Sequence, residues 1–237
     1  MKIIDMLLKK PTLSFEIFPP KNHDGDISSI YKTIDELSAL KPDFISVTYG
    51  AGGSTTEHTV EIASKIKNQY GIEAVAHLSC IDATSKQLTK ILNELKDNNI
   101  QNILALRGDY PKDYDPKTAP HEFKYASELN TFINKNYPDT FCLSGACYPE
   151  VHQEAVSLEA DLEALKKKVD SGAQYLITQL FYDNNYYYRL VREARLKGIN
   201  VPIIAGIMPA TNARSLLNIA KLSGGNIPYN LSASLER

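Results

Sequence analysis

Short apolar runs recur along this chain about every 30 residues, and most of them end in polar residues, glycine or proline. Between successive runs the apolar positions follow the spacing of three and four residues that is typical of an amphipathic helix. This alternation predicts βαβ crossovers, which require a parallel sheet. The expected strands are Thr12–Phe18, Phe44–Gly50, Glu73–Cys80, Asn102–Gly108, Phe141–Tyr148, Tyr175–Tyr182 and Pro202–Pro209.

The helices expected between these strands carry recognisable start signals. Ser85, Ser157, and Asp183 or Asn184 stand where an N-cap is needed, since their side chains accept a hydrogen bond from the first turn. A short amphipathic helix is also expected within Met1–Lys10. The longer expected helices include Ile27–Leu40, Glu57–Tyr70, Ser85–Asn98, Ser157–Ser171, Asn185–Lys197 and one around Asn212–Leu222.

Seven such units follow one another without an interruption that would mark a second domain. This regularity favours an α/β fold of the (β/α)8 TIM-type barrel over a doubly wound sheet, with one barrel domain over residues 1–237. The eighth strand is missing, because only a glycine-rich stretch and a polar tail follow the last helix. Seven strands leave two unpaired edges, so we expect that the chain is C-terminally truncated or that something else closes the sheet.

Polar side chains interrupt or end six of the seven expected strands. The pattern is clearest in Asn102–Pro111, where a continuous apolar run breaks into Arg-Gly-Asp. Each position alone has a structural explanation, such as a satisfied core residue or a surface ion pair that ends a strand. Together they predict an active site, because ligands bind at the carboxyl ends of parallel strands. The residues are Glu16, Thr48, Tyr49, His77, Arg107, Asp109, Tyr148, the nearby His152, and Gln179.

Composition and charge narrow the functional classes. A net charge of −2 argues against nucleic acid or an anionic membrane as a partner. The three cysteines are an odd number without zinc-type spacing, which favours a reducing compartment, and no apolar run approaches about 18 residues. We therefore expect a cytoplasmic protein without a membrane-spanning helix.

The residue types at the strand ends exclude several chemistries. They contain no lysine for a Schiff base, no metal-ligand cluster and no Ser–His–Asp arrangement on a nucleophile elbow. The acidic loop Asp109–Asp115 offers oxygen ligands for a cation, but its prolines restrict it, and we expect no metal. The remaining carboxylates, hydrogen-bonding groups and tyrosines suit a flat polar heterocycle, with a cofactor supplying the difficult step.

Seven short motifs occur in the order of a known family. Together they closely resemble the methylenetetrahydrofolate reductase family, the FAD-dependent catalytic barrel, from about Ser14 to Pro228. The motifs are Ser-Phe-Glu-Ile-Phe-Pro-Pro-Lys at 14–21, Val-Thr-Tyr-Gly-Ala at 47–51, His-Leu-Ser-Cys at 77–80, Ala-Leu-Arg-Gly-Asp at 105–109, Tyr-Pro-Glu-Val-His at 148–152, Thr-Gln-Leu-Phe at 178–181 and Gly-Ile-Met-Pro at 206–209.

The resemblance implies a (β/α)8 barrel with noncovalent FAD that reduces methylenetetrahydrofolate to methyltetrahydrofolate with NADH or NADPH, in a ping-pong cycle. Glu16 resembles the family's general acid, and its apolar neighbours are expected to raise its pKa. Asp109 resembles the carboxylate beside flavin and folate, and Gln179 the residue that hydrogen-bonds the pterin. The expected partners are the two substrates, and either a second copy of the chain or an electron-transfer subunit.

The same resemblance implies a set of FAD contacts. Lys167 and Lys168 also have a purely structural interpretation, because the run Lys166–Lys168 is typical of a solvated helix face. The Gly50–Thr55 loop is either a pyrophosphate cradle or simply flexible. The implied contacts are Thr48, Tyr49, His77, Arg107, Gly108, Asp109, Tyr125, Ala126, Tyr148, His152, Asp161, Lys167 and Lys168.

The chain departs from the family pattern in three places. Ala164 stands where some members have asparagine, and Ser215 lies in a segment that in some members supplies a folate-contacting glutamine. The family's last strand is absent. An alternative function therefore stays open, an FAD-binding barrel subunit or inactive remnant that needs a partner or a missing C-terminal segment. A third interpretation is a pterin methyltransferase barrel, which would carry no flavin.

Overall fold

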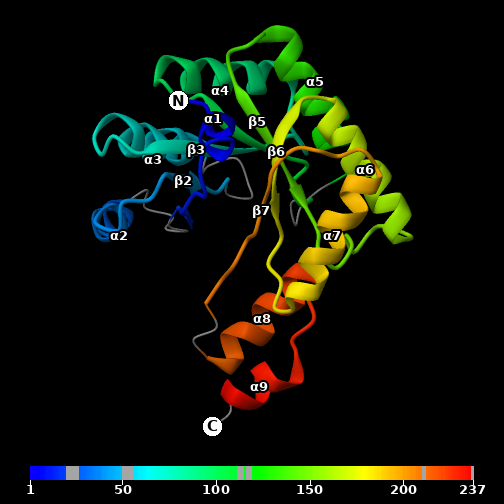
Figure 1. The fold of residues 1–237 in the computed structure, drawn as a ribbon. Helices are drawn as coiled ribbons and strands as arrows, with labels where there is room; N and C mark the ends of the chain where they lie inside the picture. The colour runs from blue at the N-terminus through cyan, green and yellow to red at the C-terminus, as the bar shows by residue number, and fades with distance from the viewer. Residues whose placement is uncertain (20–26, 50–55, 111–114, 116–118, 210–211, 236–237) are drawn as a thin grey trace. The chain divides into compact units, whose positions relative to one another are not determined.

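Seven strands form one sheet in a computed structural model of the chain, which describes residues 1–19, 27–49, 56–110, 115, 119–209 and 212–235 (Figure 1). They are parallel and hydrogen-bonded in the order β1 to β7, as in an α/β fold of the TIM type. The predicted fold class is thereby confirmed, and no eighth strand lies within the described residues. The strands are β1 Ser14–Ile17, β2 Phe44–Val47, β3 Glu73–Ser79, β4 Asn102–Leu106, β5 Cys142–Cys147, β6 Ala173–Thr178 and β7 Ile203–Ile204.

All seven predicted strands are confirmed, but each ends earlier than expected. The difference is greatest for β7, which keeps two of the residues expected over Pro202–Pro209. Gln179, expected inside a strand, comes directly after β6, although its backbone N–H still donates to Cys147 O at 2.8 Å. Most of the predicted polar residues therefore lie in the connections that follow the strands, whereas Glu16 and His77 remain within β1 and β3.

The helices alternate with the strands as predicted, with three corrections. Thr84, not Ser85, is the N-cap of α4, because its hydroxyl accepts from Gln87 N. The predicted caps Ser157 and Asp183 are confirmed. Helix α5 had no predicted counterpart, and the tail expected to be only polar contains α9. The helices are α1 Ile3–Leu7, α2 Ser28–Ser38, α3 Thr56–Asn68, α4 Ser85–Asp97, α5 Ala126–Asn136, α6 Leu158–Asp170, α7 Asn184–Leu196, α8 Ala213–Ser223 and α9 Tyr229–Leu235.

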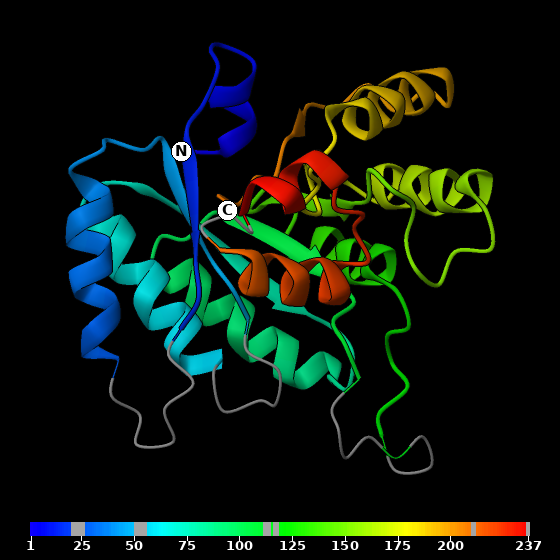
Figure 2. The ribbon, with the colours of Figure 1, turned by 90° about the horizontal axis from the view of Figure 1, so that it is seen from below.

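The chain forms two compact units, Met1–Ser144 and Gly145–Arg237, and the boundary falls within β5. In the first unit, α2, α3 and α4 lie in a row along the sheet (Figure 2). Alternate strand residues face these helices and join their apolar side chains in one core. This core includes Ile45, Val47, Ala76, Leu78 and Ile103 from the strands, and Ile34, Ile62, Leu92 and Ile133 from the helices.

The opposite face of the first unit's sheet carries polar side chains. Strand pairing places Glu16 beside Ser46, Ser46 beside Val75 and Val75 beside Asn102, so these residues share one face. His77 and Ser79 follow Val75 on the same face, because strand side chains alternate with a period of two. We call this the polar face and define it as Glu16, Ser46, His77, Ser79, Asn102 and Ser144.

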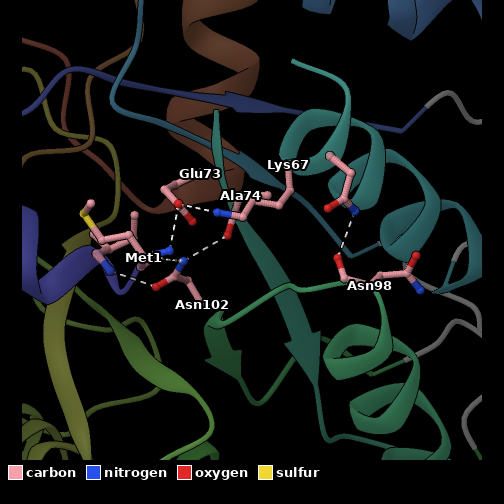
Figure 3. Close-up of polar contacts among 8 residues, drawn as sticks. Met1, Lys67, Glu73, Ala74, Asn98 and Asn102 are labelled. Carbon is pink, nitrogen blue, oxygen red and sulfur yellow. Dashed lines mark hydrogen bonds and ion pairs between the residues drawn. The ribbon is translucent and has the colours of Figure 1, made fainter. Parts of the chain in front are cut away.

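Asn102 ties the amino-terminal segment to the amino end of this sheet (Figure 3). It is fully buried, and its Oδ1 accepts from Ile3 N at 2.8 Å. Its Nδ2 donates to Met1 O at 3.1 Å and to Ala74 O at 3.3 Å. A buried amide that satisfies three backbone groups fixes the segment that leads into β1.

The second unit has its own small core. Leu162 and Leu165 of α6 and Leu190 of α7 pack against Leu176 of β6 and Cys147 of β5. Helices α8 and α9 follow at the carboxyl-terminal end of the chain (Figure 1). Among the described residues of both units, no helix is long and apolar enough to cross a membrane.

Candidate functional site

Glu16 lies on β1 with its side chain on the polar face, between apolar neighbours that turn toward the helices. Its Oε2 lies 3.5 Å from Ser46 Oγ on β2 and 3.5 Å from His77 Nε2 on β3. Ser46 and His77 are buried, with 4% and 6% of their surface exposed, whereas 43% of the Glu16 side chain is exposed. The carboxyl group therefore has one oxygen against two buried polar groups while the side chain reaches solvent.

The electrostatics of this cluster follow from burial. Loss of hydration raises the pKa of Glu16 above its ordinary value, and the hydrogen bond from Ser46 opposes part of that shift. Burial lowers the pKa of His77 to about 4, because the charged imidazolium is poorly solvated there. At neutral pH the imidazole is therefore neutral. A carboxylic acid with a raised pKa is suited to donate a proton near neutral pH.

The connection after β4 begins with Arg107, Gly108 and Asp109, and its first carbonyl stays hydrogen-bonded to the end of β3 and the residues after it. Ser79 Oγ donates to Arg107 O at 2.8 Å, and Ile81 N donates to the same oxygen at 2.8 Å. Gly108 has a φ of +86°, and a Cβ on it would lie 1.9 Å from Ser79 Oγ, so only glycine fits. Asp109 follows Gly108 directly and is exposed.

Thr48 and Tyr49 follow β2 in the first unit and are both half-buried. Thr48 N donates to Ile17 O at 3.0 Å, and Thr48 O accepts from Thr59 Oγ1 of α3 at 3.1 Å. Tyr125 and Ala126 stand at the start of α5, where Glu128 Oε2 accepts from Tyr125 N at 3.2 Å. Half of the Tyr125 side chain is exposed, whereas Ala126 is buried.

In the second unit, Tyr148, His152 and Asp161 come together. The rings of Tyr148 and His152 lie edge to face with centroids 4.5 Å apart, and His152 N donates to Asp161 Oδ2 at 3.0 Å. His152 Nδ1 accepts from Glu154 N at 3.1 Å, so neutral His152 carries its proton on Nε2. Val151 lies between Tyr148 and His152 in the sequence, and its φ of +77° is a strained conformation for a β-branched residue.

The two neighbouring lysines of α6 behave differently. Lys167 is exposed, as expected of a solvated helix face. Lys168 is turned inward, its Nζ donates to Ala146 O, and loss of hydration lowers its pKa. A Cβ on Gly145 would meet the Lys168 side chain at 2.4 Å, so the glycine leaves the room that this lysine occupies. The interpretation as a solvated face therefore holds for Lys167 and not for Lys168.

Some predicted features lie elsewhere or outside the described residues. Gln179 Oε1 accepts from Leu180 N at 2.8 Å, so its amide turns back to the chain. Ala164 is exposed on α6. The Gly50–Thr55 loop and the side chain of Ser215 are outside what the structure describes. The described residues contain no group of three or more histidine, cysteine, aspartate or glutamate side chains that could hold a metal ion.

Ser46 is the residue of the Glu16 cluster that the sequence pattern did not single out. The signal was present, because Ser46 interrupts the apolar run from Phe44 to Val47. Its importance depends on the register that pairs it with Glu16, and register is a property of the folded sheet.

Comparison with known proteins identifies the family. The family model described as methylenetetrahydrofolate reductase matches residues 2–237. The chain belongs to the methylenetetrahydrofolate reductase family. The resemblance of the seven motifs is thereby confirmed.

Two relatives illustrate how much of a methylenetetrahydrofolate reductase this chain represents. It is 44% identical over 216 residues to the 5,10-methylenetetrahydrofolate reductase of Escherichia coli (strain K12), covering 91% of this chain and 70% of that protein. It is 38% identical over 251 residues to methylenetetrahydrofolate reductase (NADH) 1 of Arabidopsis thaliana, covering all of this chain and 42% of the plant protein. The chain thus spans less than half the length of this plant reductase.

The fold is also found in solved structures of low sequence identity. An uncharacterized protein from Clostridium thermocellum, described as binding two copies of 5-methyl-5,6,7,8-tetrahydrofolic acid, superposes with a TM-score of 0.66 at 17% identity. The match covers 98% of this chain and 78% of that protein. The N-acetylneuraminate lyase of Mycoplasma synoviae gives a TM-score of 0.56 at 14% identity, over 90% of this chain and 67% of the lyase. These likenesses concern the fold of this reductase-family chain alone.

Proposed function

We propose that this chain reduces methylenetetrahydrofolate to methyltetrahydrofolate with FAD and a nicotinamide cofactor, NADH or NADPH, in a ping-pong cycle. The observation that carries the proposal is Glu16, an acid of raised pKa beside a neutral, buried histidine, in a chain of the methylenetetrahydrofolate reductase family. In this proposal Glu16 protonates a folate ring nitrogen, so that the methylene bridge opens to an iminium that accepts hydride.

The side chains of each unit fit the chemistry of FAD. Tyr49 and Tyr125 in the first unit, and Tyr148 in the second, have partly exposed rings that can pack on a planar ring system. Arg107 supplies a cation for a phosphate, and His152 supplies an Nε2–H donor. We propose that these residues hold FAD, together with the other implied contacts. When bound, the flavin would take hydride from the nicotinamide and pass it to the folate.

The remaining partners are part of the same proposal. We propose Asp109 and Gln179 as folate-binding residues, a homo-oligomer or an electron-transfer subunit as the assembly, and the cytoplasm as the compartment. One domain over residues 1–237 is the proposed unit of function. The buried, unpaired cysteines Cys80, Cys142 and Cys147 support a reducing environment.

The test of the proposal uses the purified 237-residue chain. We expect it to bind FAD, with a flavin absorbance spectrum after removal of free cofactor, and to be reduced anaerobically by NADH or NADPH. The faster of the two nicotinamides identifies the co-substrate. A chain that binds no FAD under these conditions would contradict the proposal.

A second candidate is a flavin-binding barrel that needs another segment for folate turnover. It is favoured by the absence of an eighth strand among the described residues. This candidate predicts FAD binding and reduction by the nicotinamide, but no methyltetrahydrofolate until a further segment is supplied. Product analysis with and without that segment separates the two.

Asp109 provides a prediction about the flavin. Replacing Asp109 by asparagine should raise the reduction potential of bound FAD, because the anionic reduced form then lies near one negative charge fewer. Potentiometric titration of the two proteins measures the difference. Asp115→Asn is the matched control, an acidic residue further along the same connection, and should change the potential less. An unchanged or lowered potential in Asp109→Asn would place this carboxylate away from the flavin ring.

A further inference from the structure

Three side chains from three adjacent strands meet at one oxygen atom. Strand pairing sets Glu16 of β1 directly beside Ser46 of β2, and His77 lies two residues beyond Val75, the β3 partner of Ser46. Ser46 Oγ and His77 Nε2 are both 3.5 Å from Glu16 Oε2. Among the described residues, Oε1 has no hydrogen bond or ion pair. The two carboxyl oxygens therefore have different environments.

The two contacting groups are built into the sheet. Ser46 and His77 belong to central strands and are more than nine-tenths buried. His77 Nε2 is itself buried and makes no hydrogen bond to any described group. Glu16 Oε2, at 3.5 Å, is the carboxylate oxygen that it faces. Burying an imidazole nitrogen without a hydrogen bond costs free energy, so a small shift that brings Nε2 and Oε2 into hydrogen-bond distance would stabilise the fold.

The protonation states follow from the donors. Ser46 donates its hydroxyl proton to Oε2, which makes Oε2 an acceptor. A neutral His77 can share the same acceptor only as a donor, with its proton on Nε2. The proton of the carboxylic acid then belongs on Oε1, the oxygen without a protein partner. The charged neighbours do not alter this, because the described titratable residues of β1 to β4 are Glu16, His77 and Glu73, and Glu73 pairs with Lys67 at the amino end of β3.

We propose that Ser46, which donates a hydrogen bond to Oε2, and His77, whose Nε2 faces the same oxygen at 3.5 Å, are positioning residues for Glu16, so that Oε1 carries and delivers the acidic proton. The delivery of this proton to a substrate rests on the proposed function, whereas the contacts at Oε2 are independent of it. Since the hydrogen bond from Ser46 stabilises the carboxylate, it also opposes the effect of burial on the pKa of Glu16. His77 thus acts through Glu16, in addition to any contact with a cofactor.

The first test observes His77 in the unmodified chain without cofactor. Nitrogen-15 NMR of labelled histidine distinguishes the imidazolium ion and the two neutral tautomers, and His77→Gln assigns the signal by its loss. The proposal predicts the neutral form with the proton on Nε2 from pH 6 to pH 8. An imidazolium ion, or a proton on Nδ1, would overturn it.

The second test measures the carboxyl titration of Glu16 by carbon-13 NMR, with Glu16→Gln for assignment. Ser46→Ala and His77→Phe should each raise the midpoint by about 0.5 or more, because the first removes the hydrogen bond to Oε2 and the second removes the proposed Nε2–H that faces this oxygen. His77→Gln should stay near the unmodified value, since its amide N–H can replace Nε2–H. Ser144→Ala is the matched control, a buried serine of the polar face that donates to Ile103 O instead. Equal midpoints in Ser46→Ala and Ser144→Ala would contradict the proposal.

These readouts separate the positioning of Glu16 from the proposed function. If the chain turns over no folate but the titrations follow the prediction, the arrangement stands and the function fails. If folate turnover is found but the pH profile of its folate half-reaction is the same in Ser46→Ala and in the unmodified chain, positioning by Ser46 fails. The histidine measurement needs no variant that risks unfolding, because His77→Gln serves only to assign a signal.

Discussion

Replacing Glu16 by glutamine is expected to slow the reaction of the reduced enzyme with methylenetetrahydrofolate by about 100- to 10,000-fold. The glutamine amide keeps the size of the side chain but cannot donate the acidic proton. The reduction of the flavin by the nicotinamide needs no proton from Glu16, so its rate should change by less than about threefold. Stopped-flow measurement of the two half-reactions gives both rates.

The control for this substitution is Glu36→Gln, which changes an exposed glutamate on α2 in the same unit. It should leave both half-reactions near the rates of the unmodified chain. If Glu16→Gln instead slowed both half-reactions equally, Glu16 would be a structural or cofactor-binding residue rather than the acid.

Replacing Asn102 by alanine should destabilise the first unit by about 3 kcal/mol. The substitution leaves Ile3 N–H, Met1 O and Ala74 O without their shared partner at a fully buried position. Urea unfolding of the variant and the unmodified chain measures the loss as a lower midpoint.

Asn136→Ala is the matched control, because Asn136 is an exposed asparagine whose Nδ2 bonds only locally to Phe132 O on the same helix. Its midpoint should correspond to a change within about 0.5 kcal/mol. An Asn102→Ala chain as stable as Asn136→Ala would show that the amino-terminal segment is not anchored by this amide.

The strands were predictable because each is a short apolar run with clear boundaries. Asn102–Leu106 begins at the predicted residue and ends two residues earlier than predicted, before the positive φ of Gly108. Helix α9, Tyr229–Leu235, was missed because its apolar residues alternate with polar ones instead of following the helical spacing. The cap of α4 was misplaced by one residue, because Thr84 and Ser85 are both good caps and only geometry decides between them.

Candidate site residues could be named from the sequence, but the surroundings of each side chain could not. Glu16 and His77 stood out as polar residues in apolar runs, but their meeting at one oxygen depends on the pairing of three strands. Likewise, Lys167 and Lys168 are the same residue type in one basic run, but Lys167 is exposed and Lys168 turns inward against Gly145. Such differences arise from packing across the sheet, which periodicity does not encode.

The most direct test of folate reduction by this chain is an anaerobic single turnover of the 237-residue protein with bound FAD. The flavin is first reduced with a chemical reductant, and methylenetetrahydrofolate is then added without any nicotinamide. If the chain reduces methylenetetrahydrofolate, the flavin absorbance returns and one methyltetrahydrofolate forms for each flavin reoxidised. A reduced flavin that persists after folate addition, or reoxidation without methyltetrahydrofolate, would contradict it.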